Sequence, residues 1–117
     1  MKKHKHSQKC RLLPGMLEIL ILKSLDRNPD PMHGWGIVLE LQQLSNDVLE
    51  IEEGSLYPAL QRLEIKGYVK SKWGQSDNNR RARLYRLTPA GRKEFKEEAP
   101  SFERLLEATL RLLQTAS

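Results

Sequence analysis

The stretch that decides the fold is Gly54-Ser55-Leu56-Tyr57-Pro58-Ala59-Leu60-Gln61-Arg62-Leu63-Glu64-Ile65-Lys66-Gly67. It predicts one short helix, because Ser55 can cap a first turn, Pro58 is tolerated within that turn, and Gly67 suits the left-handed residue that ends a helix. Three leucines at helical spacing mark the buried side: Leu56, Leu60 and Leu63. The opposite side is polar, and its candidate DNA-binding residues are Ser55, Tyr57, Pro58, Gln61 and Arg62. Their hydroxyl, amide and guanidinium groups can reach bases or phosphates in a major groove, although an amphipathic helix with a solvated face shows the same pattern.

Charge is sorted along the chain. The 20 basic and 15 acidic residues give a net charge of +5. Residues 1–11 carry +5, residues 12–53 carry −6, residues 54–93 carry +8 and residues 94–117 carry −2. A basic block centred on the short helix and its neighbour indicates a surface for a polyanion.

Length and composition limit the class of protein. A chain of 117 residues with 38% hydrophobic residues forms one small domain with an appended element. The longest apolar run, residues 19–22, is too short to span a bilayer, and the basic start is not followed by the apolar segment of a signal peptide. The single Cys10 cannot form an internal disulfide, which fits a reducing compartment. We therefore expect a cytoplasmic protein.

The first half of the chain predicts a tail, two helices and a short strand. Residues 1–11 are typical of a basic tail that is disordered when free; an arm laid on phosphates or in a minor groove is the alternative reading of this pattern. Pro14 predicts the first position of a helix that is apolar nearly all round, and we assign its Leu17 and Leu20 to contact with a second subunit. A second helix is expected over residues 33–44, with His33 as a cap or surface residue, and a short strand over residues 48–51.

After Gly67 the pattern changes to a hairpin. Residues 68–73 alternate at period two, residues 74–79 are rich in turn formers, and residues 83–87 predict the returning strand. Arginines crowd the tip and the return limb, and the candidate phosphate contacts are Arg80, Arg81 and Arg83. The alternative is a soluble hairpin edge whose charges discourage aggregation.

The last segment predicts a long amphipathic helix. Thr88 is a cap and Pro89 suits the first helical position. Apolar residues follow at spacings of three and four, and Pro100 is expected to kink or split the helix. We expect a homodimer seam that includes Phe95, Phe102, Leu106 and Leu113. The alternative is that this helix packs back onto its own domain.

Three helices followed by a two-stranded hairpin predict a mainly α fold, the winged helix-turn-helix, whose third helix enters the major groove. We expect a tail at 1–11, a DNA-binding domain at 12–88 and a dimerisation helix at 89–117. The competing class is a winged helix that binds protein and not DNA, against which the basic block argues. An enzyme is not expected, because the sequence has no phosphate loop, no metal-spaced His/Cys set and no nucleophile grouping; no cofactor or metal is implied.

Four segments carry a resemblance to a known family: Leu13-Pro14-Gly15, His33-Gly34-Trp35, Glu53-Gly54-Ser55-Leu56-Tyr57-Pro58-Ala59-Leu60 and Arg80-Arg81-Ala82-Arg83-Leu84-Tyr85-Arg86-Leu87-Thr88-Pro89-Ala90-Gly91. Through them residues 12–92 resemble the PadR-type transcriptional regulators. The resemblance implies a homodimeric winged-helix DNA-binding protein, usually a repressor, with a C-terminal dimerisation helix. Many members have Tyr at the place of Trp35, which keeps an aromatic ring there.

The C-terminal portion is similar to the short-tailed branch of the family. Some dimers of that branch bind flat aromatic compounds in a central pore between tryptophans of this helix, and here Phe102 stands at the matching position. A small aromatic effector that contacts Phe102 is thus an expectation from the resemblance, and the missing tryptophan is a departure from the pattern. We further expect a pseudo-palindromic promoter site whose half-sites lie about 34–36 Å apart, or a multiple of that distance.

Overall fold

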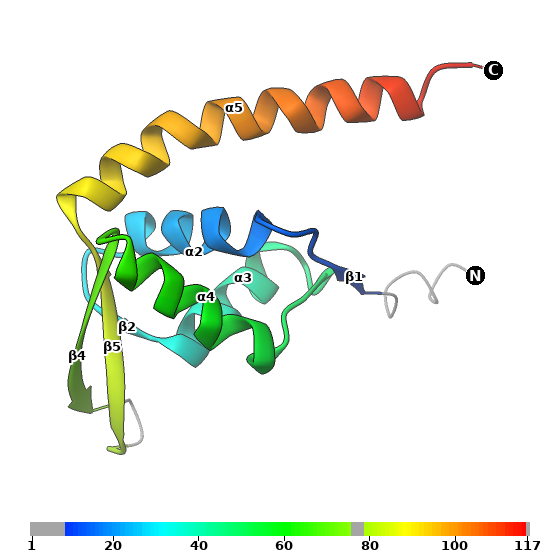
Figure 1. Cartoon of the computed structure of the whole chain (residues 1–117). Coiled ribbons are helices and arrows are strands. Elements are labelled where there is room, and N and C mark those ends of the chain that lie inside the picture. Colours follow the sequence, from blue (N-terminus) through cyan, green and yellow to red (C-terminus); the bar gives the residue numbers. More distant parts are fainter. Residues whose placement is uncertain (1–8, 76–78, 117) are drawn as a thin grey trace.

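The computed structural model describes residues 9–75 and 79–116, and Figure 1 shows how its elements are arranged. In chain order they are β1 (Cys10–Arg11), α2 (Met16–Arg27), β2 (Met32–His33), α3 (Gly34–Leu44), β3 (Leu49–Glu50), α4 (Glu53–Ile65), β4 (Val69–Gln75), β5 (Arg81–Leu87) and α5 (Pro89–Leu113). The fold is the expected winged helix-turn-helix with a long C-terminal helix. Within the described ranges, no helix is both long and apolar enough to cross a membrane.

The core lies between α2, α3 and α4 and includes side chains of β4 and β5. Its most buried large side chains include Ile21, Ile37, Leu56 and Leu60, each 0% exposed. Leu63, the third leucine of the predicted stripe, is 2% exposed. Fully burying a side chain of this size contributes about 1.5–3 kcal/mol. The stripe on α4 therefore anchors this helix and turns its polar side outward.

Helix α4 begins earlier than the sequence predicts. Its cap position is Glu52, and the Glu52 carbonyl accepts hydrogen bonds from the N–H groups of Ser55 and Leu56 at 2.9 and 3.1 Å. Ser55 is therefore inside the helix, so its predicted role as the cap is wrong. Pro58 lies inside the helix and leaves the Gly54 carbonyl without its usual donor, which exposed Gly54 tolerates because water can solvate that oxygen. Gly67 has a φ of +82° and ends the helix as predicted.

The first two helices are also delimited by local signals. Helix α2 begins at Met16, not at Pro14, because Gly15 adopts a φ of +87° between them. At α3 the Nδ1 atom of His33 accepts a hydrogen bond from the Gly36 N–H at 3.1 Å, so His33 is a cap, one of its two predicted roles.

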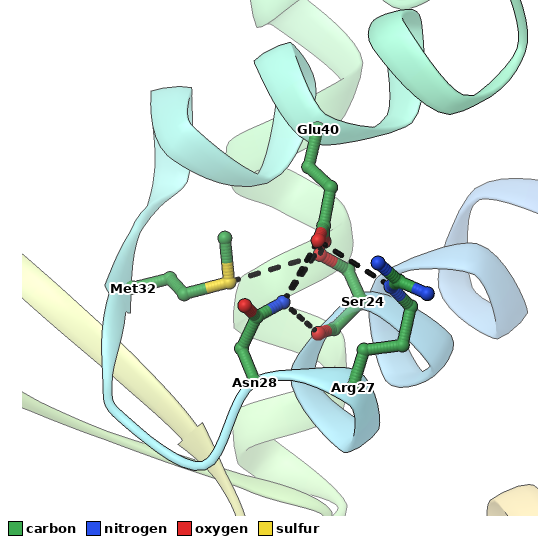
Figure 2. Close-up of polar contacts among 5 residues, drawn as sticks. All are labelled: Ser24, Arg27, Asn28, Met32 and Glu40. Atoms are coloured by element: carbon green, nitrogen blue, oxygen red, sulfur yellow. Dashed lines mark hydrogen bonds and ion pairs between the residues drawn. The ribbon is translucent and has the colours of Figure 1, made fainter.

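A polar cluster joins the end of α2 to α3 (Figure 2). The carboxylate of Glu40 on α3 accepts hydrogen bonds from the Ser24 hydroxyl and from the Asn28 side-chain amide, the latter at 3.0 Å to both oxygens. Arg27 adds an ion pair at 3.4 Å. Asn28 also donates to the carbonyl of Ser24 at 2.7 Å. The cluster thereby ties the helix-turn-helix to α2, and Ser24 has its partner although it is fully buried.

The sheet contains one strand more than the predicted hairpin. β4 and β5 pair antiparallel from Val69↔Leu87 to Gln75↔Arg81, as expected, and β2 adds to the other edge of β5 through Met32↔Tyr85. The two-residue β2 shows no alternation in the sequence and was not predicted. It fixes the loop after α2 to the base of the wing.

A second, parallel pair of strands alters the predicted tail. Cys10 and Arg11 form β1 and pair with Leu49 and Glu50 of β3. The end of the expected disordered segment 1–11 is therefore a strand, while residues 1–8 lie outside the described part of the chain. Strand β3 confirms the short strand that was expected near residues 48–51.

Helix α5 runs over α2 and projects beyond the rest of the fold (Figure 1). Thr88 caps it by accepting a hydrogen bond from the Gly91 N–H at 3.0 Å, and Pro89 occupies the first turn, as predicted. The helix is one element that continues through Pro100, so it is not split there. Residues 103–116 are all exposed.

Candidate nucleic-acid interface

One side of α4 is available to a partner. Its five candidate residues are all exposed: Ser55, Tyr57, Pro58, Gln61 and Arg62. Together with the buried leucines opposite, they give α4 the two-sided character that the sequence predicts. Three of them, Ser55, Pro58 and Arg62, line a hollow of about 480 Å³ beside the start of α2.

The ring of Tyr57 packs against the start of α3. A Cβ atom at Gly34 would lie 2.9 Å from Cε1 of Tyr57, so the first residue of α3 must lack a side chain for the ring to pack there. The glycine at the start of α3 thus allows the Tyr57 ring to lie close to the backbone of that helix. Tyr57 keeps 43% of its surface exposed. Its ring is therefore packed on one side and open on the other.

Arg62 is not isolated on this surface. Its Nε donates to Oε2 of Glu18 on α2 at 2.8 Å, and the Arg62 side chain remains 53% exposed. The sequence assigned no role to Glu18, because nothing local links residues 44 positions apart.

The wing carries a stack of aromatic and cationic groups. The guanidinium of Arg81 lies 4.5 Å and that of Arg83 5.3 Å from the ring centroid of Trp73, which is 54% exposed. Trp73 and Arg83 are also cross-strand partners. A cation over an indole face is stabilised by about 0.5–1 kcal/mol at an exposed site. Trp73 therefore holds two cations in place on the wing.

Arg83 is further engaged at the junction of wing and helix. Its Nε donates to Oγ of Ser71 at 3.1 Å, and a terminal nitrogen lies 3.7 Å from Oε2 of Glu64 on α4. Ser71 donates to the same Glu64 oxygen at 2.6 Å. The sequence treats Arg83 as a phosphate contact, whereas the structure places it in a clamp between α4 and the wing. Arg81 and Arg80 are exposed nearer the tip.

Five of the six residues assigned to a dimer interface fall into three groups. Leu17 is 7% exposed and lies in the core of the single chain, so it offers no surface to a second copy. Leu20 and Phe95 are partly buried against that core. Leu106 and Leu113 are 38% and 76% exposed on the projecting part of α5.

Phe102 borders a hollow between α2, the end of α4 and α5. This hollow measures about 240 Å³ and is also lined by Ile19, Leu63, Tyr68 and Glu94, among others. The Glu94 carboxylate, with burial and other nearby acids, raises the pKa of the Tyr68 hydroxyl above its ordinary value. The hollow thus combines apolar, aromatic and acidic groups.

Comparison with known proteins gives consistent results. The model of the "Transcriptional regulator PadR-like family" matches residues 21–97. Transcriptional regulator Rv3488 of Mycobacterium tuberculosis is 39% identical over 69 residues, which make up 59% of this chain and 64% of that protein. The match thus spans less than two thirds of that relative.

Solved structures agree with the sequence match. A transcriptional regulator from Clostridium thermocellum has a TM-score of 0.72 at 29% identity over 86% of this chain and 92% of that one. Bacillus subtilis PadR, crystallised in complex with operator DNA, has a TM-score of 0.61 at 19% identity over 71% of this chain and 47% of that one, a likeness of fold. Because the family model covers more than half of the sequence, the chain belongs to the PadR-like family of transcriptional regulators, which are not enzymes.

Proposed function

We propose that this protein binds double-stranded DNA as a homodimeric repressor, at a pseudo-palindromic promoter site. Helix α4 enters the major groove and the wing lies against the neighbouring backbone. The observation that supports this proposal most is the exposed polar side of α4. The arginine-bearing wing is held next to α4 by the contacts among Glu64, Ser71 and Arg83. Both elements belong to the segment of net charge +8. The crystallised complex of Bacillus subtilis PadR with operator DNA supports the same mode of use.

The test is duplex binding at two salt concentrations, measured by fluorescence anisotropy with promoter fragments. Arg62→Ala should weaken binding of the preferred duplex by about 1–3 kcal/mol if Arg62 contacts a base. Arg81→Ala should weaken binding of every sequence and lower the salt slope by about one. Lys96→Ala, an exposed cation on α5, is the matched control and should leave both quantities unchanged. Unaltered affinity in both arginine variants would favour the winged helix that binds protein.

The dimer is proposed from the free end of α5. Five large apolar side chains are exposed there: Leu105, Leu106, Leu110, Leu112 and Leu113. Such a concentration of apolar surface on a projecting helix is typical of an interaction site, and the symmetry of most assemblies favours a second copy. Leu106→Glu with Leu113→Glu should yield monomers by light scattering, while Gln114→Glu should not. A dimer that persists in the double variant would contradict this seam.

Repression is proposed to be steric, because a bound dimer covers the promoter. Its release would need a ligand that favours a dimer with differently spaced α4 helices. The hollow beside Phe102 is where we place a small aromatic effector, since Phe102 and Tyr68 offer rings at its edge. Such a ligand should weaken duplex binding by the wild-type protein and should have a smaller effect on duplex binding by the Phe102→Ala variant. Equal effects on both proteins would remove Phe102 from the proposal.

A further inference from the structure

The pair of Glu18 and Arg62 lies at the surface that the proposed function assigns to DNA. The two residues line the same hollow as Ser55 and Pro58 of the exposed α4 face. Their side chains are 21% and 53% exposed, so the carboxylate is the more enclosed member and the guanidinium the more accessible one. The contact joins Nε of Arg62 to Oε2 of Glu18 at 2.8 Å, which is the length of a charge-assisted hydrogen bond.

The atom that Glu18 engages determines what Arg62 can still do. A guanidinium has five N–H donors, of which Nε supplies one and the two terminal nitrogens supply four. A guanine presents N7 and O6 in the major groove, and the terminal nitrogens of arginine bind both acceptors together. With Glu18 on Nε, Arg62 keeps that terminal fork. The contact therefore occupies a donor that end-on pairing with a base does not use.

Restraint at Nε also reduces the entropy lost on binding. The long arginine side chain has many rotamers and loses this freedom when it binds a base. Glu18 belongs to α2, whose neighbouring residues Leu17, Ile21 and Leu22 are fixed in the core, so the carboxylate is supplied by a rigid element. Arg62 is thereby oriented before any duplex arrives.

We propose that Glu18 is a positioning residue that orients Arg62 for recognition of one base, most naturally a guanine. This inference rests on the proposed DNA-binding function and adds a determinant of specificity to it. Glu18 would not touch DNA. Its negative charge lies beside a phosphate-binding surface and lowers the affinity for DNA of any sequence, so its benefit is confined to sequence preference.

The experiment selects duplexes from a randomised library with purified wild-type protein and then repeats the selection with variants. Arg62→Ala identifies the base position that Arg62 recognises, where preference should fall by about 5- to 150-fold. Glu18→Ala should reduce preference at that same position by up to about fivefold, as expected for a partly exposed ion pair. Preference at the other positions should not change.

Glu18→Gln separates positioning from charge. Both Glu18→Ala and Glu18→Gln remove the negative charge, but only glutamine retains an oxygen that can accept from Nε. Glu18→Gln should therefore keep most of the preference that Glu18→Ala loses. Both variants should bind a control duplex of scrambled sequence more tightly than the wild-type protein does. In an Arg62→Lys background, which has no Nε and no fork, Glu18→Ala should add no further loss of preference.

The results that overturn the inference are specific. Unchanged preference in Glu18→Ala would show that Glu18 does not orient Arg62. Equal losses of preference in Glu18→Ala and Glu18→Gln would show that the carboxylate acts through its charge alone. A loss spread over all base positions would show a general effect on the fold. A wild-type protein that enriches no duplex would refute the DNA-binding function itself, and this is observed before any variant is made.

Discussion

Replacing Glu40 by alanine should destabilise the fold by about 1–3 kcal/mol, and the contacts of the cluster in Figure 2 account for this value. Ser24 is 0% exposed and donates to Glu40, so its hydroxyl would lose its charged acceptor and keep only the weakly accepting Met32 sulfur, at 3.8 Å, in a place that water does not reach. An unsatisfied buried group costs about 1–3 kcal/mol. Asn28 loses a charged acceptor but keeps its bond to the Ser24 carbonyl, which adds about 1 kcal/mol. Arg27, 45% exposed, adds little.

Relief of the buried charge in Glu40→Ala offsets part of this loss. The Glu40 side chain is only 18% exposed, and its removal cancels a desolvation penalty of roughly 1 kcal/mol. The net effect should appear in urea unfolding as a lower midpoint with an unchanged slope, and in thermal unfolding as a decrease of about 10 °C. Glu53→Ala, which removes an exposed acid from α4, is the control.

Two further measurements make the argument refutable. The double variant Ser24→Ala with Glu40→Ala should be less destabilised than the sum of the two single variants, because neither partner is then left buried alone. Additive effects of the two substitutions, or a loss below about 0.5 kcal/mol in Glu40→Ala, would show that the cluster does not join α2 to α3 as described.

The pH dependence of stability should follow the same carboxylate. Burial alone would raise the pKa of Glu40, but hydrogen bonds from Asn28 and Ser24 and the charge of Arg27 outweigh it and lower that pKa. The unfolded chain then binds the proton more readily than the folded one. The stabilisation is present above the ordinary value of 4.5 and is lost as the pH falls through the lower, folded value. Glu40→Gln should flatten this acid branch of the stability profile; an identical branch in wild type and variant would contradict the assignment.

Three other substitutions test the fold and the wing. Gly91→Ala should destabilise the protein by about 3 kcal/mol in urea unfolding, because a Cβ there would lie 2.0 Å from a backbone carbonyl oxygen. Gly54→Ala, whose Cβ would have no described neighbouring atom within 4 Å, should stabilise by up to about 1 kcal/mol, and a loss would refute the open geometry. Arg83→Ala should lower the salt slope of duplex binding by less than Arg81→Ala, because Glu64 partly neutralises Arg83; equal slopes would contradict the clamp.

Local signals in the sequence predict most of the elements. The leucine period of α4, the Thr88-Pro89 start of α5 and the left-handed Gly67 each depend on a few adjacent residues, and each is confirmed. The predicted start of α4 is wrong because the prediction places Pro58 in the first turn. Pro58 is instead tolerated inside the helix, since the Gly54 carbonyl that lacks a donor is exposed to water. Strands β1 and β2, of two residues each, are too short to show any period.

The sequence predicts which residues form the candidate site but not which side chains they contact. The exposed side of α4 follows from the helical period alone. The partners of Arg62 and Arg83 do not follow from the helical period. Glu18 lies 44 positions from Arg62, and the contact of Glu64 with Arg83 depends on how the wing lies against α4. The sequence shows the charge of the acids in residues 12–53 but not their partners. Three of them, Glu18, Asp26 and Glu40, form contacts between helices.

These contacts make α2 the element through which the others are joined. Glu18 on α2 holds Arg62 of α4 at 2.8 Å, and Asp26 on α2 holds Arg92 of α5 at 3.4 Å. Glu40 of α3 is bound by side chains at the end of α2. Each pair is modest by itself when partly exposed, but all of them extend from one helix whose inner side is fixed in the core.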